Sequence, residues 1–152
     1  MEIKRITPGY PDTVYESLSE LDRKCFGAEG WSPAAFEEGA KRDGGIVLAA
    51  FCGEKLTGLF AGFTAADTGE ILSLAVEEDC RGQGIAKALL SEFMALIPDE
   101  VTTIALEVRQ SNAAAISLYN SFGFIKEGIR RRFYRDPVEN ADIMVKYVKE
   151  SV

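Results

Sequence analysis

The sequence predicts a mixed α/β fold in which helices cover both faces of a mostly antiparallel central sheet with one parallel strand pair. Strand and helix patterns follow one another in the order β-α-α-β-β-β-α-β-α-β-β. The tight Gly53-Glu54 turn joins two apolar runs and predicts an antiparallel pair. A strand–helix–strand segment over residues 70–108 predicts the parallel pair, because such a connection returns to the same sheet in parallel.

The N-terminal part contains one strand and two helices. The strand over Glu2–Ile6 ends at Pro8-Gly9, and apolar residues near helical spacing predict a helix over Pro11–Phe26. A serine N-cap followed by proline at the first helical position predicts a second helix over Pro33–Arg42, which Gly44-Gly45 ends.

The remaining elements form a meander followed by alternating helices and strands. Turn residues separate three strands over Ile46–Cys52, Lys55–Ala65 and Glu70–Val76, and these strands form the meander. The later elements are a helix over Gly84–Leu96, a strand over Thr102–Val108, a helix over Ala113–Ser121, and strands over Phe124–Ile129 and Ile143–Val148.

Composition limits the class of protein. A chain of 152 residues, 47% hydrophobic and 27% charged, fits one globular domain over residues 1–152. No apolar run approaches the roughly 20 residues that span a bilayer, and the N-terminus lacks a signal-peptide core, so we expect a cytoplasmic protein with no membrane partner. A net charge of −7 argues against nucleic-acid binding and is compatible with a basic substrate. We expect a monomer or a weak dimer.

The chain has no histidine, which excludes a histidine base and histidine-ligated metals. A general base must then be another residue type, such as Glu, Asp, Tyr, Lys or Cys. Cys25, Cys52 and Cys80 are far apart and offer neither a disulfide framework nor metal-ligand spacing, so we expect no metal. Cys80 is a candidate oxidation-sensitive neighbour of the turn that follows it.

The segment Arg81–Ala86 predicts a phosphate-binding turn. It follows an apolar strand and opens a helix, so unpaired backbone N–H groups and the helix dipole favour an anion there. Gly82 and Gly84 let a ligand approach the backbone, and Arg81 adds a positive charge. The pattern is neither a Walker A loop nor a dinucleotide fingerprint, because it lacks their lysine and third glycine respectively.

A long motif downstream carries a specific resemblance. The run L-E-V-R-Q-S-N-A-A-A-I-S-L-Y-N-S-F-G-F over Leu106–Phe124 is similar to the Gcn5-related N-acetyltransferase (GNAT) superfamily. Trp31-Ser32, Leu74-Ala75-Val76 and Arg130-Arg131 extend the match. Within the superfamily, the chain most resembles the bacterial enzymes that acetylate the N-terminal alanine of ribosomal protein S18.

The resemblance implies the GNAT fold, with acetyl-CoA as acetyl donor. Its pyrophosphate would sit on the Arg81–Ala86 turn, and its pantetheine arm would lie between the strands Glu70–Val76 and Thr102–Val108, which splay apart in this family. The cofactor-binding residues implied are Leu74, Ala75, Val76, Arg81, Gly82, Gln83, Gly84, Ile85, Ala86 and Asn112. Asn112 could instead, or in addition, be the N-cap of the helix that follows it.

The resemblance also implies two catalytic residues. Glu107 matches the general base, which is needed because only a neutral amine attacks a thioester. At pH 7, deprotonation costs about 1.1 kcal/mol for an α-amine and about 4.6 kcal/mol for a lysine. Tyr119 matches the general acid that protonates the leaving thiolate. The alternatives are a solvated Glu107 or a Glu107–Arg109 pair, and a purely structural aromatic at Tyr119.

The resemblance is less specific about the acceptor than about the acetyl donor. Trp31, Tyr134 and Arg130 are candidate acceptor contacts, although Arg130-Arg131-Arg132 could instead be a solvated basic edge. The favoured acceptor is an α-amino group at a protein N-terminus, with ribosomal protein S18 as the leading candidate. Two alternatives stay open: a lysine side chain or small-molecule amine (a polyamine, amino acid or antibiotic) as acceptor, or an inert acyl-CoA-binding module.

Overall fold

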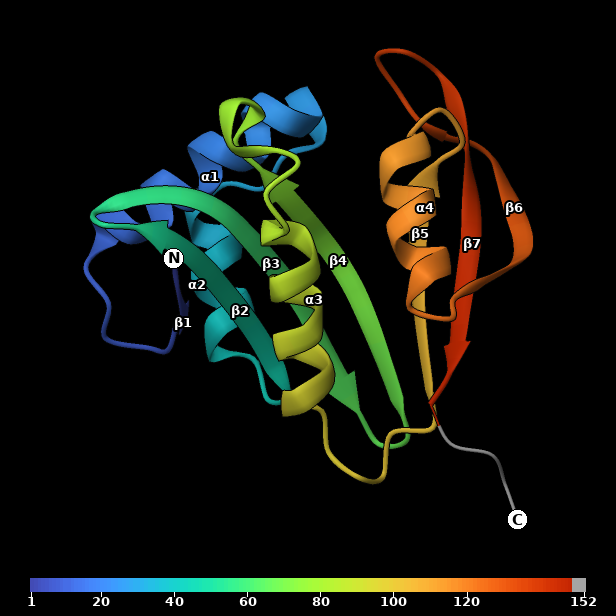
Figure 1. Ribbon diagram of the computed structural model, residues 1–152, viewed down its shortest axis with the longest axis horizontal. Coiled ribbons are helices and arrows are strands. Elements are labelled where there is room, and N and C mark those ends of the chain that lie inside the picture. Colours follow the sequence, from blue (N-terminus) through green and yellow to red (C-terminus); the bar gives the residue numbers. More distant parts are fainter. Residues whose placement is uncertain (149–152) are drawn as a thin grey trace. The chain divides into compact units, whose positions relative to one another are not determined.

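A computed structural model describes residues 1–148, and its elements follow the predicted order (Figure 1). Two short 3₁₀ turns, Gly27–Glu29 and Glu78–Cys80, are added to the predicted elements. The helices and strands are β1 Glu2–Arg5, α1 Asp12–Phe26, α2 Pro33–Lys41, β2 Gly45–Cys52, β3 Lys55–Ala65, β4 Thr68–Val76, α3 Ile85–Leu96, β5 Thr103–Arg109, α4 Ala113–Ser121, β6 Ile125–Tyr134 and β7 Glu139–Tyr147.

The seven strands form one sheet in the order β1-β2-β3-β4-β5-β7-β6. The β1–β2, β2–β3, β5–β7 and β6–β7 ladders are antiparallel. The β4–β5 ladder is parallel and pairs Thr68–Ile71 with Thr103–Leu106. The predicted fold class, with its single parallel pair, is therefore confirmed.

The chain divides into two compact units, the first with helices α1, α2 and α3 and the second with α4. The first contains Met1–Phe63 and Leu72–Ile97, and the second contains Thr64–Ile71 and the described residues from Pro98 onward. Strand β4 contributes its first residues to the second unit and its last five to the first.

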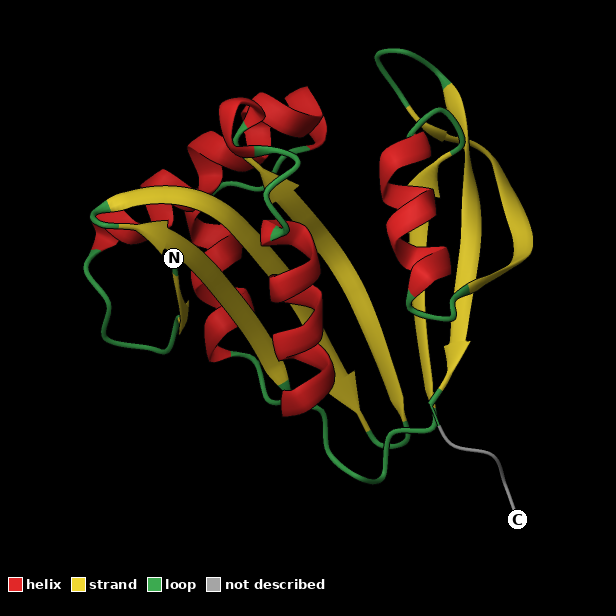
Figure 2. Ribbon diagram, in the orientation of Figure 1, coloured by secondary structure: helices red, strands yellow, loops and turns green. Residues whose placement is uncertain are grey.

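Helices lie on both faces of the strands of the first unit (Figure 2). Leu18 of α1, Phe36 of α2 and Val47 of β2 belong to one buried cluster, which lies on one face. On the other face, the rings of Phe60 in β3 and Phe93 in α3 pack with centroids 4.5 Å apart. Burial on both faces explains why β2 reads as a continuous apolar run rather than an alternating one.

In the second unit, β6 and β7 are longer than predicted. The sequence predicted that β6 ends at Ile129 and that β7 begins at Ile143, but pairing continues to Arg130↔Ala141 and Tyr134↔Glu139. β6 stands at the end of the strand order and is exposed over most of its length. A strand with this exposure does not need an apolar residue at every second position. The alternating pattern by which a strand is predicted from its sequence is therefore weak in β6.

Candidate active site

The predicted phosphate-binding turn opens α3 as expected. Gly82 and Gly84 adopt φ values of 79° and 81°, a left-handed conformation that favours glycine. Gly84 is the N-cap residue, and no side chain caps this end of α3. A Cβ atom built on either glycine would meet no other atom within 4 Å, so the space before the helix N-terminus is open. These features fit a pyrophosphate group, which the backbone N–H groups and the helix dipole favour.

The side chain of Arg81 contacts the last residue of β4 and helix α1. Its Nε donates to the carbonyl oxygen of Val76 at 3.2 Å, and one of its terminal nitrogens lies 3.6 Å from Sγ of Cys25 in α1. The guanidinium therefore links the turn to the strand that precedes it. Sequence reading predicted its charge but not these contacts, because they join residues far apart in the chain.

Glu107 lies on β5 and forms an ion pair with Arg130 of β6, with Oε1 and Nε 3.1 Å apart. Its side chain is 25% exposed, so solvent can still reach the carboxylate. The alternative pairing with Arg109 is wrong, because Arg109 instead pairs with Glu139 at 3.2 Å. Arg130, a candidate acceptor contact in the sequence, is thus a neighbour of the candidate base.

Tyr119 lies on α4 and is only 6% exposed. Burial raises the pKa of its phenol well above the usual value, and the proximity of Tyr134 raises it further. Its ring packs edge-on against Phe124 at 5.5 Å between centroids. The phenol therefore keeps its proton at every physiological pH, and the ring also has a structural role.

Asn112 caps α4, since its Oδ1 accepts a hydrogen bond from the backbone N–H of Ala115 at 3.1 Å. This confirms the N-cap interpretation. The side-chain NH₂ group is not used in the cap, so a cofactor contact through that group stays a prediction.

Arg109 holds the loop between β6 and β7. It donates to the carbonyl oxygens of Arg135 and Pro137, each at 2.9 Å, and to Glu139. Its guanidinium also lies over the ring of Tyr134, 4.4 Å from the centroid. The candidate acceptor residue Tyr134 is therefore positioned by the arginine of the L-E-V-R motif.

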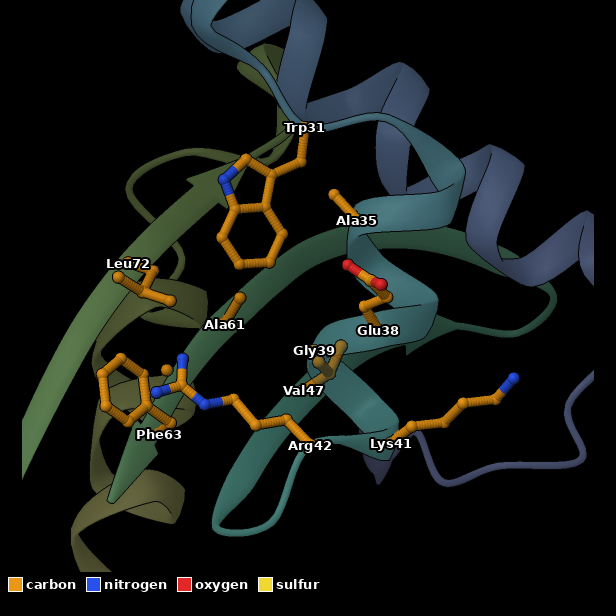
Figure 3. A pocket seen from close by; sticks show the side chains of 11 residues that line it. Trp31, Ala35, Glu38, Gly39, Lys41, Arg42, Val47, Ala61, Phe63 and Leu72 are labelled. Atoms are coloured by element: carbon orange, nitrogen blue, oxygen red, sulfur yellow. The ribbon is translucent and has the colours of Figure 1, made fainter. Parts of the chain in front are cut away.

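Trp31 lines a cavity of about 610 Å³ in the first unit (Figure 3). The cavity, here called the α2 cavity, lies between α2 and strands β2, β3 and β4. Its other apolar walls include Val47, Ala61, Phe63 and Leu72. The Trp31 ring is tilted against Phe36 of α2, with centroids 5.2 Å apart.

Asp22 is a buried carboxylate that sequence reading missed. It is 1% exposed and accepts hydrogen bonds from the backbone N–H of Trp31, at 2.7 Å, and from the hydroxyl of Ser73 in β4. Ser19 donates to the Trp31 carbonyl at 2.6 Å, so both backbone groups of this residue are held. Asp22 follows Leu18 by four residues, so both lie on the same face of α1. An acidic residue on this apolar face was the signal that the sequence offered.

We expect Asp22→Asn to destabilise the fold by about 1–3 kcal/mol, because an amide has only one acceptor oxygen, whereas the carboxylate accepts from both the Trp31 N–H and the Ser73 hydroxyl. Burial raises the pKa of Asp22 above its unfolded value. The contribution of Asp22 to stability is then complete below about pH 3.9 and declines as pH rises through the folded pKa. Urea unfolding at pH 4 and pH 8 should show the larger loss at pH 4. Equal losses at both pH values, or an equal loss in Asp43→Asn at an exposed site, would contradict this role.

Other candidate chemistry is limited in the described residues. The carboxylate of Asp79 raises the pKa of Cys80, which favours the protonated and less reactive thiol. Among residues 1–148, no cluster of His, Cys, Asp and Glu side chains could hold a metal ion. No helix in the same range is long and apolar enough to cross a membrane.

The motif, the turn and the fold define a class of enzyme, the acetyl-CoA-dependent N-acetyltransferases. The model of the acetyltransferase (GNAT) family matches residues 14–124, and the chain belongs to this family. The predicted superfamily is thereby confirmed.

Two relatives and one solved structure show the similarity in detail. The chain is 35% identical to N-alpha-acetyltransferase RimI of Mycobacterium tuberculosis over 84% of this chain and 81% of that protein. It is 43% identical to the ribosomal protein bS18-alanine N-acetyltransferase of Escherichia coli, over 51% of this chain and about half (55%) of that enzyme. The crystal structure of the ribosomal-protein-S18-alanine N-acetyltransferase from E. coli superposes with a TM-score of 0.82 at 27% identity, covering 99% and 96% of the two chains.

Proposed function

We propose that this protein transfers the acetyl group of acetyl-CoA to the α-amino group of a protein N-terminus. The observation that carries the proposal is the presence in the second unit of both a solvent-accessible carboxylate, Glu107, and a buried phenol that keeps its proton, Tyr119. The first can act as a base toward an amine and the second as an acid toward a thiolate. The names of the relatives support the N-terminal alanine of ribosomal protein S18 as the particular acceptor.

Residues of the first unit would hold the donor. The backbone of Gly82–Ala86 and the charge of Arg81 suit the pyrophosphate, and the backbone of Leu74–Val76 would pair with the pantetheine arm. Acetyl-CoA supplies the reactive thioester when it is bound. The amide of Asn112, in the second unit, would add a further cofactor contact.

Residues of the second unit would move the protons. Glu107 takes a proton from the acceptor ammonium, directly or through a water molecule, and leaves a neutral amine that attacks the thioester carbonyl. A backbone N–H at Leu74–Val76 would stabilise the oxyanion that develops. When the carbon–sulfur bond breaks, Tyr119 gives its proton to the thiolate of CoA. The attacking nitrogen loses its second proton as the amide forms, and this proton restores the phenol through water, while the proton on Glu107 passes to solvent. The amine has then formed an amide, and no acetyl-enzyme is needed.

An α-amine is the acceptor that this site can deprotonate most readily. At pH 7, deprotonating an α-ammonium group costs about 3.5 kcal/mol less than deprotonating a lysine side chain. The smaller cost favours an α-ammonium group as the one from which Glu107 takes a proton.

The test is thiol release from acetyl-CoA with three hexapeptides of the S18 N-terminal sequence. One has a free α-amine, one has that amine blocked, and one has it blocked but contains an added lysine. We expect turnover only with the free α-amine. Turnover with the lysine peptide alone would move the acceptor to a side chain, and cofactor binding without turnover on any peptide would overturn the proposal.

A further inference from the structure

Helix α4 buries a single side chain, that of Tyr119, although it is nine residues long. The cap of Asn112 satisfies its N-terminal end. Its last turn contains no basic residue, so the helix itself supplies no cation for the carbonyl groups at its C-terminal end. Because so little of α4 is buried, the position of the helix depends strongly on what contacts that end.

Lys146 of β7 contacts the C-terminal end of α4. Its Nζ donates to the carbonyl oxygen of Phe122, the C-cap residue of the helix. A Cβ atom built on Gly123 would lie 3.0 Å from the same nitrogen, so the ammonium group lies directly against the backbone. Lys146 is half-buried, and among residues 1–148 it has no carboxylate partner. A cation placed here stabilises the negative end of the helix dipole.

The turn that Lys146 contacts also holds Tyr119. This turn, here called the α4 turn, consists of residues 122–124. The carbonyl oxygen of Tyr119 accepts from the N–H groups of Phe122 and Phe124, each at 3.0 Å. The ring of Phe124 packs on the Tyr119 ring and is itself only 1% exposed. The backbone and the ring of Tyr119 are therefore both attached to the α4 turn.

Lys146 connects the α4 turn to the strands of the second unit. β7 lies between β5 and β6 in the strand order, so it is paired on both sides. Lys146 pairs with Ile104 of β5, and Ile143 of the same strand pairs with Glu107. The lysine thus joins the helix that carries the candidate acid to the strand pair that carries the candidate base.

We propose that Lys146 is a positioning residue for Tyr119, and that its hydrogen bond to Phe122 sets where the phenol lies relative to the strand of Glu107. A general acid acts only within hydrogen-bond reach of the atom that it protonates. A displacement of about 1 Å can cost as much as 10²-fold in rate. This inference rests on the proposed function for the role of Tyr119, but its structural test does not depend on turnover.

Fluorine NMR of the protein labelled with 3-fluorotyrosine reports on the position of the ring. The Tyr119 signal is identified by its absence from Tyr119→Phe. Lys146→Met should shift or broaden this signal, because methionine has a similar stem but cannot donate to the carbonyl. Lys146→Arg, which can donate, should keep it. Lys126→Met is the matched control, since Lys126 is a lysine of the same unit that pairs with Asp142.

Thiol release from acetyl-CoA with the free-amine S18 hexapeptide measures the catalytic consequence. Lys146→Met should lower kcat by roughly 10-fold, less than Tyr119→Phe, because the phenol is displaced rather than removed. The KM for the peptide should stay unchanged, and Lys146→Arg and Lys126→Met should keep the wild-type kcat. Lys146→Gln, which is shorter and uncharged, gives the same test should the methionine variant not fold.

Two further measurements separate positioning of the acid from a general loss of structure. The Lys146→Met deficit should shrink with an acetyl donor whose thiol is more acidic than CoA, as expected for Tyr119→Phe. Lys146→Met should cost nothing more in the Tyr119→Phe background and its full factor in the Glu107→Gln background. Equal further losses in both backgrounds, or a wild-type kcat in Lys146→Met alone, would overturn the proposal.

The two readouts also distinguish this inference from the proposed function. If the wild-type protein acetylates no peptide with a free α-amine, the proposed function fails, and the fluorine signal alone decides whether Lys146 positions Tyr119. If the wild-type protein acetylates the peptide while Lys146→Met keeps both its kcat and its fluorine signal, the proposed function holds and the assignment of Lys146 fails.

Discussion

Glu107→Gln should lower kcat by about 10²-fold or more at neutral pH, because a positioned general base contributes about 10²–10⁴ to the rate. The amide is nearly the same size as the carboxylate, and its oxygen can still accept from Nε of Arg130. The fold and the position of the side chain should therefore survive, while the ability to take a proton is lost.

The pH dependence makes this prediction specific. As pH rises, more of the acceptor amine is already neutral, so the deficit of Glu107→Gln should shrink toward pH 9. Steady-state thiol release between pH 6.5 and 9 measures it. Glu70→Gln is the matched control, since Glu70 is a half-buried strand carboxylate of the same unit. A wild-type rate for Glu107→Gln across the whole range, with chemistry rate-limiting, would remove Glu107 from the mechanism.

Tyr119→Phe should lower kcat by roughly 10²-fold, because the buried phenol supplies the proton for the leaving thiolate. The variant keeps the aromatic ring, so the edge-on contact with Phe124 should preserve the fold. Burial raises the pKa of Tyr119, and the wild-type enzyme should therefore show no loss of activity from its ionisation up to pH 10.

The leaving group distinguishes an acid from a structural residue. An acetyl donor whose thiol is more acidic than CoA expels its thiolate without help, so the deficit of Tyr119→Phe should shrink with that donor. The deficit of Glu107→Gln should not shrink. Tyr147→Phe, at an exposed tyrosine of the same unit, is the control and should keep the wild-type rate. A Tyr119→Phe deficit that is the same for both donors would assign Tyr119 to packing alone.

Local rules predicted most of the elements correctly. Ser32 caps α2 through its hydroxyl, which accepts from the N–H of Ala35 at 3.1 Å, and the α4 bounds agree with the sequence prediction. These signals are short-range, since caps, turns and helical spacing act within a few residues. The β6–β7 hairpin was underestimated because an exposed edge strand has little apolar pattern.

For the site, the sequence alone identified the glycine-rich turn, and the L-E-V-R motif pointed to Glu107 and Tyr119 through a family resemblance that the family match confirms. Their roles stay predictions. The sequence also indicated that an acidic, histidine-free chain needs another base. These conclusions depend on residue type and on neighbours along the chain.

Only the tertiary structure decided which charges are used and which are free. It joined Glu107 to Arg130 rather than to Arg109, held Trp31 and Ser73 on the buried Asp22, and left Glu38 unpaired within the described residues. Each of these pairings, or the lack of one, depends on strands and helices brought together from distant parts of the chain. Local spacing carries no information about such long-range register, because packing and hydrogen bonding across the fold select the partners.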